Sequence, residues 1–237
     1  MPAKVVIRAV RTPADPALGG AYRLLKQVFH DAEMVSRRDW EAVMRERAAG
    51  VWTDLNWHLL VAVRAGRLAG VATGSYLGNV NVGLIGYIAV APGARKLGIG
   101  PRLRRRLRAA FERDALRIAR RPLKAIVGEV RSDNPWLATL LTREGVITLD
   151  FPYYQPALKK RRPVPLTLYY QALGRPRRSL PAGEVRRLLY TIWRRPYRIP
   201  QPLAYPSFRR MLSALAGRRR VGRTARRDRH HAGALPL

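Results

Sequence analysis

Cysteine is absent from the 237 residues of this sequence. Disulfides, thiolate nucleophiles and thiolate metal ligands are therefore excluded. Long apolar runs are missing as well: the longest, near residues 80–92, is too short and too rich in glycine to span a bilayer. The first residues show neither a long apolar stretch nor a small-residue cleavage site, so we expect no signal peptide and a soluble, cytoplasmic protein.

Acidic residues are scarce. The chain has 15 Asp and Glu against 46 Lys and Arg, which gives a formal net charge of +31. Such a charge attracts polyanions: nucleic acid, anionic lipid head groups or a phosphorylated cofactor. A composition rich in arginine and alanine also follows from a GC-rich genome, so the charge alone does not select a partner. The hydrophobic share of 47% is sufficient for a packed core.

The pattern of apolar residues predicts a mixed α/β chain. Ser36 is a candidate N-cap of the second helix, and Ala65-Gly66 is a candidate tight turn between two antiparallel strands. Helices are expected near 16–29, 36–44, 101–111 and 134–141, the third with Pro101 at its first position. Strands are expected at 4–9, 58–63, 68–75, 83–90, 123–130, 147–154 and 164–171. This order is typical of a sheet covered by helices.

The composition changes near Gly174, where arginine and proline become dominant and acids nearly vanish. We therefore place one domain over residues 1–172 and an arginine- and proline-rich extension over 173–237. The extension should be partly helical, at 185–193 and 208–215, with a disordered tail from Gly217.

Three roles for this extension stay open. It could contact nucleic acid, or it could dock on an anionic membrane through Leu188, Leu189, Ile192 and Trp193. The interpretation that we favour is packing over the domain, because the extension offers apolar anchors at Tyr190, Trp193, Tyr197 and Phe208.

The segment 87–103 carries the clearest chemical signal. It consists of an apolar strand, a loop of small residues and the start of a helix. A helix N-terminus presents unpaired N–H groups and the positive end of a dipole, and glycines let the backbone approach an anion closely. Arg95 and Lys96 add positive charge. These features together predict a cradle for a pyrophosphate.

Two other phosphate-binding motifs are excluded by spacing. A P-loop requires Lys-Ser/Thr directly after its glycines, and this segment has none. A dinucleotide-binding fingerprint requires a third glycine, and that position is Leu103. An ordinary strand–loop–helix connection remains the alternative.

The hexapeptide Arg95-Lys96-Leu97-Gly98-Ile99-Gly100 resembles the acyl-CoA signature of the GNAT superfamily of N-acetyltransferases, Arg/Gln-x-x-Gly-x-Gly/Ala. The preceding segment 88–92 resembles the family's fourth strand, and Glu129, Asn134 and Gly145 stand where the family has its fifth strand and fourth helix. The resemblance covers residues 4–171. It implies an α/β fold of the α+β kind: a mixed, mostly antiparallel sheet of about seven strands, flanked by helices and splayed between strands four and five.

The resemblance also implies a cosubstrate, acetyl-CoA, and no metal. The four histidines show no metal-ligand spacing with carboxylates. The backbone of Ile88, Ala89 and Val90 should pair with the pantetheine amides. The pyrophosphate should be held by Arg95 and by the main chain of Lys96, Leu97, Gly98, Ile99, Gly100 and Pro101. Asn134 should lie near the pantetheine or the departing thiol, although it could also be a plain helix cap.

The implied reaction transfers an acetyl or other short acyl group from acyl-CoA to a primary amine by direct attack on the thioester. Glu129 is our candidate base, although a salt bridge to Arg131 or to a helix arginine would also explain it. The usual tyrosine acid, seven residues after the helix asparagine, is Leu141 here. Tyr154, Tyr153 or solvent would then supply the proton, with packing in a strand as the alternative for the tyrosines. Because of Leu141, a non-catalytic CoA-binding or nucleic-acid-binding module on the same fold stays open.

Overall fold

The computed structural model describes residues 4–222, apart from 52–53, 144 and 159–161. The disordered tail predicted from Gly217 is wrong for its first residues, because Arg220 and Val221 pair with Pro181 and Leu180 and Val221 is buried. The rest of that tail, with His230 and His231, lies outside the described residues. The main elements are β1 (Val5–Val10), α1 (Ala17–Lys26), α2 (Arg37–Ala48), β2 (Leu55–Arg64), β3 (Arg67–Leu77), β4 (Val82–Val90), α3 (Ile99–Asp114), β5 (Ala125–Val130), α4 (Pro135–Arg143), β6 (Ile147–Thr148), β7 (Tyr153–Gln155), β8 (Val164–Ala172), β9 (Leu180–Pro181), α5 (Ala182–Arg194), α6 (Pro206–Ala214) and β10 (Arg220–Val221). The short helical turns are η1 (Pro92–Ala94), η2 (Ala115–Ala119) and η3 (Pro202–Ala204).

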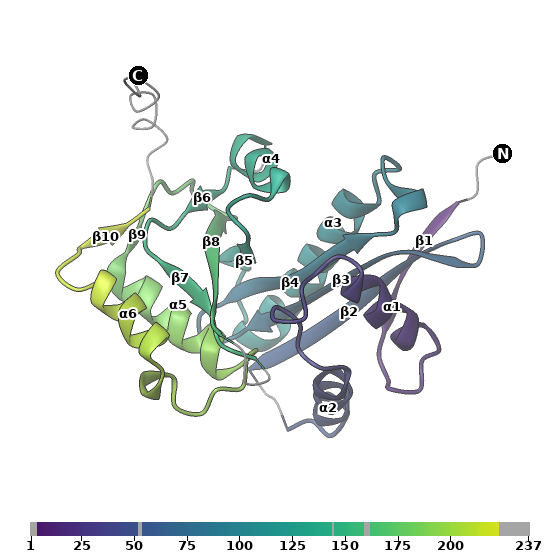
Figure 1. Cartoon of the computed structure of the whole chain (residues 1–237), viewed down its shortest axis with the longest axis horizontal. Coiled ribbons are helices and arrows are strands. Elements are labelled where there is room, and N and C mark those ends of the chain that lie inside the picture. The colour runs from purple at the N-terminus through teal and green to yellow at the C-terminus, as the bar shows by residue number, and fades with distance from the viewer. Residues whose placement is uncertain (1–3, 52–53, 144, 159–161, 223–237) are drawn as a thin grey trace, which may run out of the picture.

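The main sheet has the order β1-β2-β3-β4-β5-β8-β6, and β7 pairs separately with β8. All pairs are antiparallel except β4 with β5. This arrangement confirms the predicted GNAT-type sheet (Figure 1). The sheet has eight strands where about seven were expected. The predicted strand over 147–154 is divided into β6 and β7, with Pro152 between them, and the two parts pair with different stretches of β8.

The parallel pair opens after four residues. Val82 to Ile85 of β4 pair with Ala125 to Gly128 of β5, and no pairing follows. At the same place the register of β4 against β3 shifts, so that Gly86 stands opposite no residue of β3. Thr73 Oγ1 accepts the amide of Tyr87 across this bulge (3.1 Å). The bulge therefore bends β4 where β5 leaves it, which gives the predicted splay.

Two layers of helices cover the sheet. On one face α3 packs Leu107 and Phe111 against β3 and β4, close enough that a Cβ at Gly83 would lie 2.1 Å from the Phe111 ring. On the other face α1 and α2 bury Leu25 and Trp40 against β2 and β3. The N-terminus of α2 has the predicted cap: Ser36 and Asp39 form a capping box. The turn at Ala65-Gly66 also forms, with both residues at positive φ.

The C-terminal segment belongs to the same core as the sheet. Leu188, Leu189, Ile192 and Trp193 of α5 are buried with Val127 of β5 and with β8, and Phe208 and Met211 of α6 join them. In Figure 1, α5 and α6 lie beside β7 and β8, at the far end of the molecule from β1. The four residues that we considered for membrane docking are therefore unavailable to lipid, because they face the core. No helix within the described ranges is long and apolar enough to cross a bilayer.

Candidate active site

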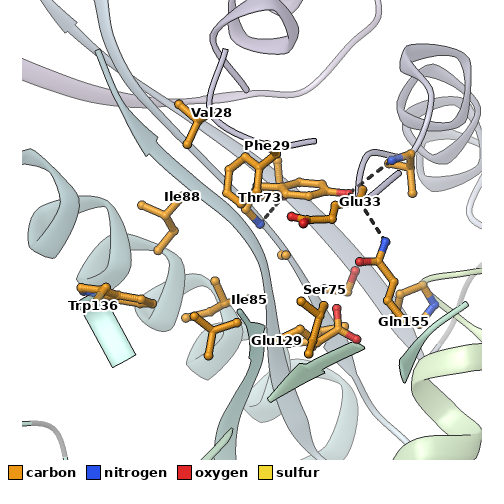
Figure 2. A pocket seen from close by; sticks show the side chains of 18 of the residues that line it. Val28, Phe29, Glu33, Thr73, Ser75, Ile85, Ile88, Glu129, Trp136 and Gln155 are labelled. Carbon is orange, nitrogen blue, oxygen red and sulfur yellow. Dashed lines mark hydrogen bonds between the residues drawn. The ribbon is translucent and has the colours of Figure 1, made fainter. Parts of the chain in front are cut away.

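A cavity of about 980 Å³ opens where β4 and β5 part. One end is lined by the loop 94–101 and by Asn134 and Trp136, and the other by the loop between α1 and α2 and by residues 195–198. Figure 2 shows the two ends: Ile88 and Trp136 lie toward the first, and Glu33 and Gln155 toward the second. Glu129 of β5 and the predicted site residues of the loop, apart from Leu97, line this one cavity.

The loop at the first end has the backbone of an anion cradle. Lys96 and Gly98 have positive φ values of 65° and 67°, and Gly98 is the N-cap of α3. Within the described part of the chain, the amides of residues 96–100 donate no hydrogen bond to other main-chain or side-chain atoms. A Cβ at Gly98 would meet nothing within 4 Å, and Lys96, Gly98, Ile99 and Gly100 line the cavity. The first turn of α3 carries no acidic residue, which leaves the positive end of the helix dipole uncompensated.

The side chains of this loop divide by role. Arg95, Lys96, Leu97 and Pro101 are exposed, whereas Ile99 is buried and anchors the loop to the core. Pro101 was expected at the first position of the helix, and this prediction is wrong by two residues, because α3 begins at Ile99. The proline still lies in the first turn, where an N–H would have no partner within the helix.

The main chain of β4 offers its free edge to the same cavity. The amide of Ala91 donates to the Ala69 carbonyl of β3 (3.0 Å), as that of Tyr87 donates to Thr73. Because successive amides of a strand point in opposite directions, the amides of Ile88 and Val90 face away from β3, toward the gap left by β5. Ala89 is buried against the α1 and α2 side of the sheet. The edge 88–90 can thus receive an extended polar chain as an added strand.

Glu129 lies at the opening between the strands. Gly128 is the last residue of β5 that pairs with β4, so Glu129 is the first one beyond the pairing. Its two carboxylate oxygens accept hydrogen bonds from the phenols of Tyr153 and Tyr197. Burial raises the pKa of Glu129, and the two phenol hydrogen bonds oppose that rise without cancelling it.

The salt bridge that we considered for Glu129 does not form. Arg131 instead binds Glu33 (3.3 Å) and Asp133 (3.2 Å), and Glu129 has no cationic partner among the described residues. A carboxylate held only by phenols can accept a proton without breaking an ion pair, which is the property that a general base needs.

Tyr154, our first tyrosine candidate, points away from the cavity. Its ring lies under Arg210 of α6 (5.8 Å), and its amide contacts the sulfur of Met211 (3.3 Å). Neighbouring residues of a strand face opposite sides, and it is the phenol of Tyr153 that donates to Glu129. Tyr153 therefore replaces Tyr154 as our candidate for the tyrosine of the site.

Asn134 lines the first end of the cavity and also caps α4. Its Oδ1 accepts a hydrogen bond from the amide of Trp136 (3.0 Å), as expected for a helix cap. The NH2 group of the same side chain can donate to a ligand in the cavity. Leu141, at the position where the family usually has tyrosine, is exposed on α4. It lies outside the set of cavity-lining residues and offers no proton.

The loop between α1 and α2 is held over the cavity by two side chains from distant strands. The phenol of Tyr87 donates to the Glu33 carbonyl (2.6 Å) and accepts the amide of Val35 (3.2 Å). The side-chain amide of Gln155 donates to the same Glu33 carbonyl (2.9 Å), as Figure 2 shows. Burial raises the pKa of the Tyr87 phenol well above its usual value, so this clamp stays protonated over the physiological range.

The second end of the cavity is mainly apolar. Its walls include Phe29, Trp40, Val43, Leu55 and Trp57. The charged side chains there are compensated in pairs: Arg195 binds Asp54 (2.6 Å), and Arg198 binds Glu46. His30 also lines this end, on the loop where we expected it, and it is exposed to solvent.

Sequence reasoning missed Tyr197 and Gln155. Tyr197 follows α5 in a turn closed by Arg198, which has a φ of 55°, and by a hydrogen bond from the Ile199 amide to the Trp193 carbonyl (3.0 Å). It had been noted only as an apolar anchor. No local pattern links it to Glu129, 68 residues earlier in the chain.

Comparisons with known proteins agree with this geometry. Residues 23–126 match the model of the acetyltransferase (GNAT) family. A GNAT-family protein from Bacteroides thetaiotaomicron has a similar structure, with a TM-score of 0.59 and 16% identity, over 82% of this chain and 99% of that one. The search of curated proteins found no match.

Two further structures have the same fold. A protein of Salmonella typhimurium named as an acetyltransferase, solved with its cofactor acetyl-CoA, has a TM-score of 0.50 and 18% identity, over 73% of this chain and 96% of that one. The ribosomal-protein-S18-alanine N-acetyltransferase of Escherichia coli has a TM-score of 0.50 and 17% identity, with the same shares. Residues 23–126 thus resemble a GNAT acetyltransferase domain, and the fold of the chain is that of solved GNAT proteins. Among the described residues, no three His, Cys, Asp or Glu side chains gather as a metal site.

Proposed function

We propose that this protein transfers an acetyl or other short acyl group from acyl-CoA to a primary amine. One observation carries the proposal: a single cavity leads from the unpaired amides of residues 96–100, along the free edge of β4, to the buried carboxylate of Glu129. The first part suits a pyrophosphate, the second an extended pantetheine chain, and the third a group that loses a proton.

The proposed reaction requires few of the protein's own groups. An alkyl ammonium has a pKa near 10, so a base must take its proton before the nitrogen can attack the thioester carbon. Glu129 takes this proton. The outward amides of Ile88 or Val90 donate to the carbonyl oxygen as negative charge develops on it. The carbon–sulfur bond then breaks, and the thiolate leaves with a proton from solvent or from the ammonium that formed.

The cavity walls favour an acceptor with one ammonium on an apolar body. Each acid at the acceptor end other than Glu129 already has a partner: Glu33 has Arg131, Asp54 has Arg195, Glu46 has Arg198, and Asp39 caps α2 with Ser36. Glu129 and Asp39 are held by neutral groups alone, Glu129 by two phenols at the opening between the strands and Asp39 by Ser36 at the start of α2. An aromatic or aliphatic body on the amine would contact Phe29 and Trp57.

The substitution Glu129→Gln tests the proposal. Removing the base should lower kcat by about 100-fold or more, within the usual range for general-base catalysis, while calorimetry finds acetyl-CoA affinity unchanged. Glu112→Gln is the matched control, because Glu112 is exposed on α3 and paired with Arg108. Unchanged turnover in Glu129→Gln would remove this residue as the base. Absence of acetyl-CoA binding in the unaltered protein would contradict the whole proposal.

The alternative is a non-catalytic CoA-binding or nucleic-acid-binding module, favoured by the exposed Leu141 at the usual acid position. Acetyl-CoA binding without CoA release, tried with 2-phenylethylamine, 1,6-diaminohexane and lysine, would support that alternative. Retention on nucleic acid or on anionic vesicles at rising salt would reveal a role for the positive charge.

A further inference from the structure

The C-terminal segment reaches the base of the proposed reaction. Residues 195–198 line the cavity, although they follow the family match, which ends at residue 126, and lie beyond the domain boundary expected at 172. The segment is fixed from three sides. α5 buries Trp193 in the core, Arg195 binds Asp54 before β2, and Arg198 binds Glu46 on α2.

We propose that Tyr197 is a positioning residue for Glu129: its phenol, together with that of Tyr153, fixes the carboxylate in the cavity and keeps it ionised for proton transfer. This inference rests on the proposed function for its catalytic meaning, but the contact itself stands on geometry. Each phenol donates to a different oxygen of the same carboxylate, one from β7 and one from the turn after α5. Two donors from opposite sides define both the position of the carboxylate and its rotation about the last side-chain bond.

Neutral donors have a specific advantage at this place. An arginine would hold the carboxylate more strongly, but its charge would lower the basicity that the reaction requires. A phenol stabilises the ionised form by hydrogen bonding and brings no charge. The pKa of each of the two phenols is raised well above its ordinary value, by burial first and by the negative charge of Glu129 next. Both therefore remain donors throughout the working range of pH.

The other ionisable groups near Glu129 are phenols or belong to ion pairs. Tyr87 on β4 also has a raised pKa, again because of burial first. Glu33 of the α1–α2 loop and Arg131 after β5 are paired with each other, and Arg195 and Arg198 beside Tyr197 are paired with Asp54 and Glu46. Because the Tyr197 phenol donates its hydrogen bond to Glu129, a change in the acidic limb of the rate profile caused by Tyr197→Phe is assigned to Glu129.

The test compares Tyr197→Phe, Tyr153→Phe and a control, Tyr190→Phe, which removes the same oxygen from an exposed tyrosine of α5 outside the cavity. Losing a donor to the charged form raises the pKa of Glu129. The acidic limb of kcat/KM should move up by about one to two pH units, because a hydrogen bond to a charged group contributes about that much. Activity should recover at higher pH, and the Tyr190→Phe profile should match that of the unaltered protein.

A loss of kcat that is equal at every pH, with no shift of the limb, would overturn the proposal and leave Tyr197 a packing residue. A second readout does not depend on turnover: a carbon-13 NMR titration of the Glu129 carboxyl in the unaltered chain and in Tyr197→Phe. A higher midpoint in the variant supports the positioning role even if no amine is acylated, in which case only the proposed function fails. An unchanged midpoint overturns the positioning role even if the enzyme is active.

Discussion

The two ends of the cavity are built in different ways. The end proposed for acyl-CoA consists mainly of one stretch, from the bulge at Gly86 to the first turn of α3, which offers main-chain groups to the cavity; Asn134 and Trp136 complete it. The acceptor end is assembled from side chains of the α1–α2 loop, β2, β5, β7 and the turn after α5. Main-chain geometry tolerates many sequences, whereas a side-chain constellation depends on particular residues from distant segments. The first end therefore resembles a large family, whereas the second depends on side chains that the fold brings together from distant segments.

The largest effect should come from the anchor of the C-terminal segment. Trp193→Ala leaves a cavity in the core that α5 shares with β5 and β8, and should lower the free energy of unfolding by about 3–5 kcal/mol. Urea unfolding measures this change. Trp193→Phe is the control and should cost far less, because the buried indole N–H has no partner within the described chain. An unchanged midpoint in Trp193→Ala would mean that the segment is an appendage after all.

Next in size is a change at the acyl-CoA end alone. Gly100→Asp places a carboxylate where the pyrophosphate should bind, and like charges brought together should weaken acetyl-CoA binding about 100-fold. The free protein should keep its melting temperature, because an acid in the first turn suits the helix dipole and a Cβ there has room, 3.8 Å from Val90.

Gly100→Asn is the neutral control for calorimetry of acetyl-CoA binding, since it adds the same bulk without the charge. If Gly100→Asp and Gly100→Asn weaken binding equally, the loop does not bind the negative charge of acetyl-CoA. In that case the main chain of this loop would not be a pyrophosphate site.

A smaller effect is expected at the acceptor end from Arg131→Gln. This change removes the cationic partner of the buried Glu33, so the cavity gains one more carboxylate without a positive charge beside it. The ratio of kcat/KM for 1,6-diaminohexane to that for 2-phenylethylamine should rise about threefold to tenfold, on the scale of one partly screened charge pair. Acetyl-CoA affinity should not change. Arg108→Gln, on the exposed side of α3, should leave the ratio where it was.

The smallest effect concerns stability and pH. The pKa of Glu129 is raised in the folded state, so its contribution is favourable below the pKa of the unfolded chain and is lost as pH rises through the folded value. Glu129→Gln cannot ionise, so at pH 8 its free energy of unfolding should be higher than that of the unaltered protein, and the difference should vanish toward pH 4. Thermal melts at the two pH values decide this. A variant that is less stable at pH 8 would mean that the phenols stabilise the carboxylate more than burial destabilises it.

Prediction from the sequence succeeded where the signal was local. The helix cap at Ser36 and the turn at Ala65-Gly66 each depend on residues within a few positions of one another. The splay of the sheet was expected from a family resemblance, and its physical cause, the bulge at Gly86, was not foreseen. The division of residues 147–154 into two strands was also missed, because the pairing partner of each part is set by β8.

Short-range chemistry in the chain decides that an anion can bind at the start of α3, because free amides and a left-handed glycine are properties of the local backbone. It also decides that Glu129 ends an apolar strand. Which groups surround that carboxylate is decided only by the fold, since Tyr153 and Tyr197 approach it across 24 and 68 residues of chain. Alternation along β7 selects Tyr153 over Tyr154, and the burial of α5 brings in Tyr197. No sequence pattern predicts these two contacts, because each depends on how distant parts of the chain pack against one another.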